Sequence, residues 1–187
     1  MKSQDSLHRF FDTAADKIVL QNMESGDSEV ELKLRRVSVC VKSYNSENQF
    51  VRKLSQFIWK CFLRLQHIGG YKRNKQQVFK KSSQWCSLTA EAVAYMLSVK
   101  REVLRKYRYT FCGDEFFVFS ELYSSPLKDK ICQYDKLLKC DFFRTGPIVY
   151  NSADYEKLTT SNCLFARKFS ASDLAIVDRL REHHITD

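Results

Sequence analysis

Residues that break helices and strands are scarce, since the 187-residue chain has only 5 glycines and 2 prolines. This scarcity argues against a repeat-rich or linker-like chain. Apolar residues never run uninterrupted for the ~20 positions that a membrane-spanning helix needs. We therefore expect one folded domain, or part of a larger one, that is soluble or peripheral to a membrane.

The seven cysteines form no C-x-x-C pair, and their number is odd. Neither a zinc ribbon nor a thioredoxin-type redox site is therefore supported. Their neighbours are mostly apolar, which is typical of reduced, buried thiols. We expect a cytoplasmic protein, with peripheral contact to a membrane as the alternative.

Hydrophobic residues make up 44% of the chain and aromatic residues 13%, which is ample for a packed core. The net charge is +9. Such a surface could attract nucleic acid, anionic lipid headgroups or phosphorylated small molecules, and composition does not choose among them.

Helix-like and strand-like patterns alternate along the chain, which predicts an α/β fold. Apolar residues at helical spacing predict a helix over 6–15, and a buried strand follows at 18–20. Valines alternate with smaller or polar residues over 36–42, which predicts a strand with one buried face. A further strand over 163–169 and a last helix from about residue 172 complete the pattern.

The clearest amphipathic helix is predicted between Glu47 and Ile68, and Gly69 and Gly70 end it. Its apolar residues form one stripe, namely Phe50, Leu54, Phe57, Ile58, Cys61, Leu65 and Ile68. Its basic residues fall elsewhere. They form either an ordinary solvated face or a face that lies on an anionic membrane.

Basic residues, hydroxyls, an amide and an indole follow between Tyr71 and Trp85. Such a loop could hold sugar hydroxyls with Trp85 stacked on a pyranose face, or bind single-stranded nucleic acid. The alternative is that Trp85 is a core residue. A second helix, capped by Thr89, is predicted next, with its buried side formed by Val93, Met96, Leu97 and Leu104.

Two adjacent carboxylates, Asp114 and Glu115, then lie between apolar flanks. Among Phe116, Phe117 and Phe119, a carboxylate would lose hydration, which suits it to accept a proton. Taken by its chemistry alone, the pair is equally compatible with a plain helix start. Asp114 would then be the N-cap, and Glu115 would lie in the first turn.

Four motifs occur in an order that resembles the core-2/I-branching glycosyltransferase family. They are Ser-Gln-Trp-Cys-Ser-Leu-Thr at 83–89, Tyr-Thr-Phe-Cys-Gly-Asp-Glu-Phe-Phe at 109–117, Asp-Tyr-Glu-Lys-Leu at 154–158 and Leu-Phe-Ala-Arg-Lys-Phe at 164–169. The family contains β-1,6-N-acetylglucosaminyltransferases and protein xylosyltransferases, and bacterial members share its short domain. Each motif alone is weak, but four in the right order are strong evidence.

Residues 1–11 resemble an internal segment of this family that follows the first part of its nucleotide-binding region. We therefore expect residues 1–187 to be a single partial domain of a bacterial-type member. The resemblance implies the C-terminal portion of a GT-A-like α/β fold, a mixed sheet flanked by helices. It also implies inverting transfer of N-acetylglucosamine or xylose from a UDP-sugar to a hydroxyl of a glycan or peptide, without a metal or other cofactor.

The resemblance also assigns the site residues. Glu115 matches the catalytic base, and Asp114 would support it. Ser83, Gln84 and Trp85 match the loop near the donor and acceptor sugars. The chain departs from the family at two flanking positions, with Ser82 and Gly113 in place of the family's glycine and proline.

Cationic side chains take the place of a metal at the UDP diphosphate in this family. Lys168 matches the diphosphate lysine, and Arg144 lies at about the spacing of its partner arginine. Arg167 is the alternative to Arg144.

Two rival interpretations stay open. The chain could be an inactive relic that keeps the second half of the fold. It could also be a basic nucleic-acid-binding module built on Trp85 and the Lys/Arg clusters. The basic residues are spread over several predicted helices without a recognised binding motif, so we expect no nucleic-acid partner.

Overall fold

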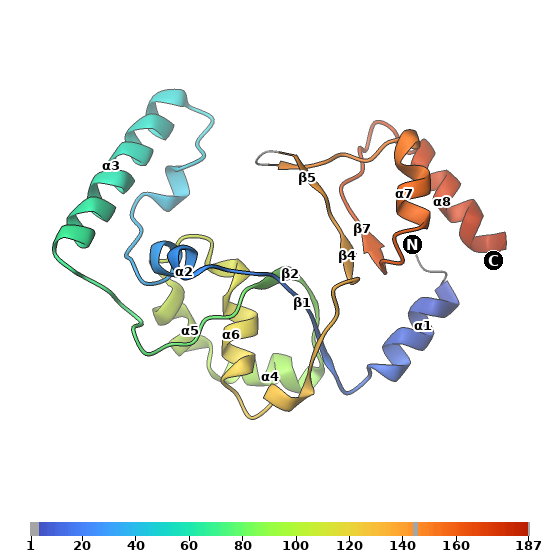
Figure 1. Ribbon diagram of the computed structural model, residues 1–187, viewed down its shortest axis with the longest axis horizontal. Coiled ribbons are helices and arrows are strands. Elements are labelled where there is room, and N and C mark those ends of the chain that lie inside the picture. The colour runs from blue at the N-terminus through green and yellow to red at the C-terminus, as the bar shows by residue number, and fades with distance from the viewer. Residues whose placement is uncertain (1–3, 144–145, 187) are drawn as a thin grey trace. The chain divides into compact units, whose positions relative to one another are not determined.

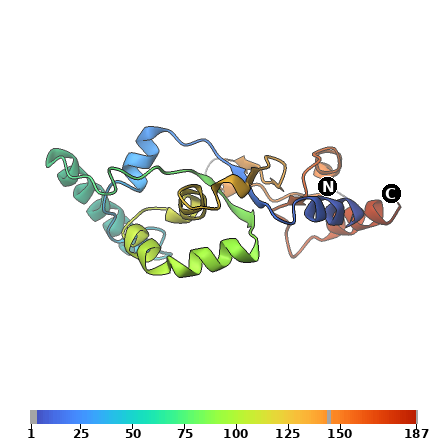
Figure 2. The ribbon, with the colours of Figure 1, turned by 90° about the horizontal axis from the view of Figure 1, so that it is seen from below.

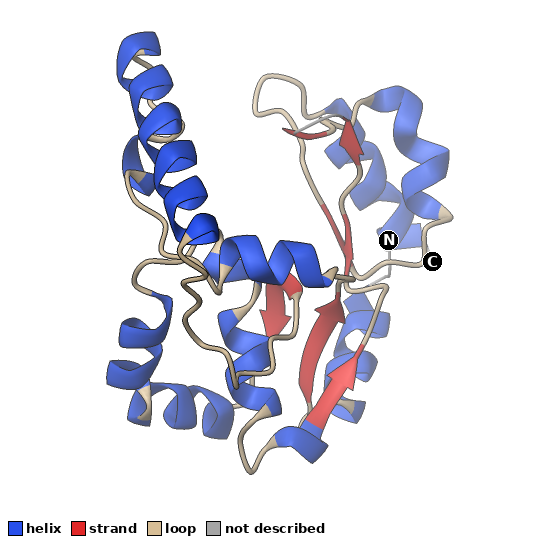
Figure 3. Cartoon of the chain, turned by 60° about the vertical axis from the view of Figure 1, so that its left-hand side comes forward, coloured by secondary structure: helices blue, strands red, loops and turns tan. Residues whose placement is uncertain are grey.

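The computed structural model describes residues 4–143 and 146–186 (Figure 1). Helices predominate and the strands are short, which confirms the predicted α/β class (Figure 3). The chain forms two compact units. Unit 1 comprises Met1–Asn22, Trp85–Thr89 and Lys130–Asp187, and unit 2 comprises Met23–Gln84 and Ala90–Asp129. The prediction of a single partial domain stays a prediction.

A three-stranded sheet of order β2-β1-β3 runs through unit 1. Its central strand β1 (Ile18–Asn22) pairs in parallel with β3 (Ile131–Gln133), with Ile18 opposite Ile131. The last three residues of β2 (Ser82–Ser87) belong to this unit. The first three residues of β1 are fully buried, as expected for a central strand of a parallel pair, and the strand predicted at 18–20 is confirmed.

Two smaller sheets follow in unit 1. In the first, β4 (Leu138–Lys139) pairs in parallel with β7 (Phe165–Ala166), and in the second, β5 (Phe142–Phe143) is antiparallel to β6 (Gly146–Pro147). The helices of the unit are α1 (Gln4–Thr13), the 3₁₀ turn η4 (Ser152–Asp154), α7 (Tyr155–Thr159) and α8 (Ala175–Thr186). The first and last predicted helices are confirmed, whereas the strand predicted over 163–169 is regular only in β7.

Unit 1 has two apolar clusters. One is formed by Tyr150, Leu158, Ile176 and Leu180, and the other by Val19, Leu137 and Leu164 with α1 packed against it. Next to the first cluster, the Asp141 carboxylate lies between two lysines. Its oxygens are 2.9 Å from Lys139 Nζ and 2.7 Å from Lys157 Nζ.

Unit 2 is mostly helical. Its elements are α2 (Asp27–Lys33), the turn η1 (Val41–Ser43), α3 (Gln49–Ile68), α4 (Ala90–Ser98), α5 (Lys100–Tyr107), the turn η2 (Gly113–Glu115), α6 (Phe117–Tyr123) and the turn η3 (Lys128–Lys130) at its border. Consecutive helices α4 and α5 lie along one side of this unit (Figure 2). Its core gathers around Val30, Leu34 and Phe116.

The long helix α3 confirms the prediction of a helix over 47–68. Asn48 caps it, because its side-chain oxygen accepts hydrogen bonds from the amides of Phe50 and Val51. The face that packs on the unit is opposite to the apolar stripe, however. The buried side chains are Ser55, Trp59 and Gln66, whereas Phe50 is 75% exposed and the rest of the stripe is open as well.

The strand predicted over 36–42 is absent, and the Gln66 side chain and the Tyr109 carbonyl, rather than a neighbouring strand, satisfy part of its backbone. The Gln66 amide donates to the Val37 carbonyl at 2.8 Å and accepts from the Val37 N–H at 2.8 Å. Arg36 is buried and donates to Glu31 at 2.6 Å and to the Gln66 carbonyl at 2.8 Å. Burial alternates along this segment, but with the opposite face inward: Arg36 and Ser38 are buried and the valines are not.

Two further expectations about burial are wrong. Helix α4 does begin directly after Thr89, but the buried residues on α4 and α5 are Ala92 and Val103. Val93, Leu97 and Leu104 are exposed. All seven cysteines are free, as predicted, yet only one of them, Cys163, is buried.

No helix within residues 4–143 and 146–186 combines the length and the apolarity of a membrane-crossing helix.

Replacing Gln66 tests the polar core of unit 2. Gln66→Leu leaves the N–H and C=O of Val37 without their partner, so we expect the free energy of unfolding to fall by about 2 kcal/mol. Urea denaturation followed by circular dichroism measures this. Gln49→Leu, on the exposed first turn of the same helix, is the control and should stay within about 0.5 kcal/mol of wild type. Equal effects of the two changes would contradict this role of Gln66.

The Asp141 cluster predicts acid sensitivity. The hydrogen bond from Lys157, together with Lys139, lowers the pKa of Asp141 to about 2, although partial burial opposes the shift. An unfolded aspartate has a pKa of about 3.9, so this stabilisation is present above that pH and is lost as the pH falls towards 2. We expect Asp141→Asn to remove about 1 to 2 kcal/mol of stability near neutral pH. It should also flatten the acid limb of the stability curve, that is, the fall of the unfolding free energy as the pH is lowered.

The control for this experiment is Asp135→Asn, which changes an exposed aspartate of the same unit. It should leave both the stability and its acid limb as in wild type. An unchanged acid limb in Asp141→Asn would show that the two lysine pairs do not stabilise the native state.

Candidate functional site

The predicted base Glu115 lies at the end of the turn η2. Cys112, directly before this turn, has a left-handed φ of 51° and leads the chain into η2. Asp114 does not cap the following helix, since the N-cap position of α6 is Phe116 and no side chain caps it. The predicted N-cap role of Asp114 is therefore wrong.

Glu115 belongs to a network of four charged side chains of alternating sign in unit 2. Lys33 Nζ lies 2.7 Å from the Glu29 carboxylate and 3.1 Å from Glu115 Oε2. Lys81 Nζ lies 2.8 Å from Glu29 and 3.7 Å from Glu115 Oε2. Two lysines thus bridge two glutamates, and helix α2 supplies one member of each sign.

The charges in this network shift one another's protonation. Burial alone would raise the pKa of Glu29, but hydrogen bonds from Lys33 and Lys81 outweigh it and lower that pKa below the ordinary value. Burial alone would lower the pKa of Lys33, but its hydrogen bonds to Glu29 and Glu115 raise that pKa. Lys33 is therefore charged near neutral pH.

This environment differs from the apolar one expected for Glu115. Phe116 and Phe119 are buried in the core of unit 2, and the Glu115 side chain is 30% exposed beside two lysines. Both lysine contacts reach Oε2. Across the part of the chain that the structure describes, no bond or ion pair engages Oε1, so one carboxylate oxygen is anchored and the other is open.

The structure brings Gln84 and Asp114 together. They are 30 residues apart in the sequence, and the Gln84 side-chain amide donates a short hydrogen bond to Asp114 Oδ2. Both side chains are exposed. The middle residue of Ser83-Gln84-Trp85 is thereby fixed beside the carboxylate that precedes Glu115.

Gly113, which stands where the family has proline, is closely packed. A Cβ atom on this residue would lie 2.5 Å from Thr110 Oγ1 and 3.3 Å from Tyr107 Cδ1. Thr110 Oγ1 is itself held by a hydrogen bond to the Tyr107 carbonyl at 2.8 Å. The turn that carries Glu115 therefore has no room for a side chain.

Trp85 and Arg167 meet in unit 1. The Arg167 guanidinium carbon lies 5.5 Å from the centre of the half-exposed Trp85 ring, within the range of a cation–π contact. Lys168 follows directly and is exposed. Its main chain pairs with Tyr150 and Ile148, and within residues 4–143 and 146–186 its ammonium has no ion-pair partner.

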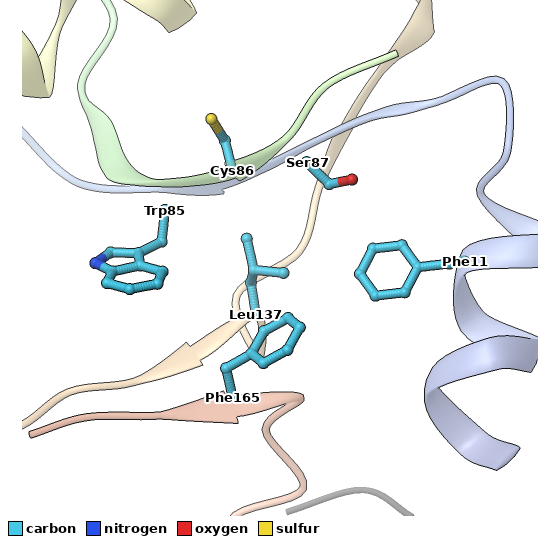
Figure 4. A pocket seen from close by; sticks show the side chains of 6 residues that line it. All are labelled: Phe11, Trp85, Cys86, Ser87, Leu137 and Phe165. Carbon is cyan, nitrogen blue, oxygen red and sulfur yellow. The ribbon is translucent and has the colours of Figure 1, made fainter. Parts of the chain in front are cut away.

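Trp85 also forms one wall of a cavity of about 280 Å³ in unit 1 (Figure 4). Figure 4 shows the indole across from Phe11, with Leu137 and Phe165 between them. The Ser87 hydroxyl and the Trp85 indole nitrogen are polar groups among the lining residues, which Cys86 completes. Such walls suit a planar or carbon-rich face rather than a charged group.

The remaining predicted residues contribute less. Ser83 is half-buried in β2. Arg144 lies outside the described residues.

Burial raises the pKa of the Cys112 and Cys86 thiols, which disfavours thiolate chemistry at either position. In the part of the chain that the structure describes, no group of three or more His, Cys, Asp or Glu side chains could hold a metal ion.

Sequence reasoning missed Glu29, Lys33 and Lys81. The spacing of Glu29 and Lys33 by four residues on one helix was the available signal, because such pairs face each other. Both residues lie on α2, which begins at Asp27. No local pattern links Lys81 to the other charges.

No known protein family matches the chain, and no curated protein matches it either. The resemblance to the core-2/I-branching family stays a prediction.

Gly113→Ala tests the packing of the turn that carries Glu115. We expect it to lower the free energy of unfolding by about 1 to 3 kcal/mol, because the added methyl overlaps the Thr110 hydroxyl. Urea denaturation measures the loss. Gly146→Ala is the control, since no described atom lies within 4 Å of a Cβ there. A Gly113→Ala protein as stable as wild type would mean that the turn is loose.

Proposed function

We propose that the chain is part of an inverting glycosyltransferase that moves N-acetylglucosamine or xylose from a UDP-sugar to a hydroxyl of a glycan or peptide. The observation that carries the proposal is the hydrogen bond between Gln84 and Asp114. It joins two of the motifs on which the family resemblance rests. A GT-A-like fold, a cytoplasmic location and independence of metal are parts of the same proposal.

The proposed reaction is a single displacement. The acceptor hydroxyl attacks the anomeric carbon, the bond from that carbon to the UDP oxygen breaks, and UDP leaves from the opposite side. Glu115 takes the hydroxyl proton on its open oxygen Oε1 as the new bond forms. Lys33 supports this role by position, because its ammonium lies 3.1 Å from Oε2 and Oε1 has no ion-pair partner among the described residues.

Negative charge develops on the leaving diphosphate and needs stabilisation. We assign this task to the cations of unit 1, Lys168 with Arg144 or Arg167. The exposed ammonium of Lys168 supports the assignment. Trp85 and Ser83 would contact the sugars, since an indole ring packs well against the carbon-rich face of a pyranose.

The lysines around Glu115 also support a second candidate, an inactive relic. Glu115 Oε2 lies 3.1 Å from Lys33 Nζ and 3.7 Å from Lys81 Nζ, and a carboxylate with a purely structural role would make the same contacts. In an inactive relic, these ion pairs would stabilise the fold without any turnover of a substrate.

Glu115→Gln tests the proposed base. Release of UDP from UDP-N-acetylglucosamine or UDP-xylose, with and without glycan and peptide acceptors, should fall by roughly 10²- to 10⁴-fold in this variant. Activity of the wild type should persist in EDTA. Glu102→Gln, on the exposed side of α5, is the matched control and should keep the wild-type rate.

Two outcomes would overturn the enzyme proposal. A folded wild type that neither binds UDP nor releases it from a UDP-sugar would favour the relic. Turnover that is unchanged in Glu115→Gln would remove Glu115 from the reaction.

A further inference from the structure

Helix α3 exposes a continuous apolar face. It lies at the edge of unit 2 (Figure 1), and its stripe residues fall within about 100° of the helix circumference at 100° per residue. The four most exposed large side chains of the stripe are Ile68 at 82%, Phe50 at 75%, and Phe57 and Leu65 at 65% each. The opposite face is already packed on the unit through Trp59.

Cations border this apolar face. On the helical projection Lys53, Lys60 and Arg64 lie side by side along one edge of the stripe, and all three are exposed. The 20 residues of α3 include no aspartate or glutamate. None of these three cations has an ion-pair partner among the described residues, so the positive charge of the edge is uncompensated.

We propose that this face of α3 binds the surface of an anionic lipid bilayer. A helix with an open apolar stripe and a basic edge lies in the plane of the membrane interface, where the stripe contacts acyl chains and the cations contact lipid phosphates. Phe57, Lys60, Cys61, Leu63 and Arg64 line a surface hollow of about 460 Å³ that combines both kinds of contact. The proposal does not depend on glycosyl transfer.

Charge complementarity favours a bilayer over the other occupants. A second copy of the chain would bring the same three cations to the same apolar stripe, without acidic residues on α3 to pair with them. Nucleic acid would match the cations, but its phosphate backbone would leave the exposed leucines and isoleucines of the stripe without an apolar partner. Anionic lipid satisfies both features.

Flotation with lipid vesicles tests the proposal on the full chain. We expect binding to vesicles of phosphatidylcholine and phosphatidylglycerol in equal parts, little binding to phosphatidylcholine alone, and weaker binding at high salt. The double variant Phe57→Ser/Leu65→Ser should lower the partition coefficient by about tenfold or more. Its matched control is Leu97→Ser/Leu104→Ser, which removes apolar side chains of 63% and 60% exposure from α4 and α5 of the same unit.

A charge-reversal pair separates the basic edge from the general positive charge of the protein. Lys53→Glu/Lys60→Glu should reduce binding by about tenfold or more, whereas Lys100→Glu/Arg101→Glu, with the same change in net charge, should reduce it much less. Circular dichroism and the unfolding midpoint confirm that each variant folds, as expected for exposed positions.

Three results would overturn the proposal. The first is a wild type that does not float with the anionic vesicles. The second is equal loss of binding in each test variant and its control, which would indicate a nonspecific response to charge or apolarity. The third is a concentration-dependent dimer that Phe57→Ser/Leu65→Ser abolishes while vesicle binding is unchanged, which would assign the face to a second copy.

Discussion

The ion pairs of Lys33 and Lys81 with Glu29 and Glu115 are the interaction on which the candidate site depends. They join helix α2, the residue preceding β2 and the turn η2, so they fix three segments that are distant in the sequence. The side chains of both lysines are mostly buried. Removing one glutamate would therefore leave a buried ammonium group with less opposite charge beside it. An arrangement of alternating charges avoids this because each ammonium has two carboxylates within reach. The position of Glu115 thus follows from the network more than from the aromatic residues beside it.

A second constraint explains why unit 2 buries polar groups and exposes apolar ones. A segment without a strand partner must satisfy its backbone by other means, and around Val37 the Gln66 side chain does so. Once Gln66 faces the unit, the geometry of α3 turns the stripe that includes Phe57 outward, because the two positions differ by about half a turn at 100° per residue. The burial of Arg36 follows from the same arrangement, since it donates to the Gln66 carbonyl at 2.8 Å.

The sequence predicts where helices form better than it predicts which side they bury. Periodicity and end signals located α1, α3 and α8 because these depend on residues close together in the chain. The buried faces of α3 and α4 and the absent strand over 36–42 depend on contacts that are distant in the sequence. The same division holds at the site. Gln84 and Asp114 were both predicted to be functional and are in contact, whereas the pairing of Lys81 with Glu29 across 52 residues has no local signature.

The chemistry of the network limits which group could act as the base. Lys33 has a raised pKa and stays protonated near neutral pH, so it cannot accept a proton there. Glu29 is held by both lysines through the same oxygen at less than 3 Å, and its lowered pKa makes it a poor acceptor. In Glu115 the second lysine is 3.7 Å away, and the other oxygen is open within the described residues. Of the two carboxylates, Glu115 is therefore the one that could take up a proton while its other oxygen still accepts the hydrogen bond from Lys33.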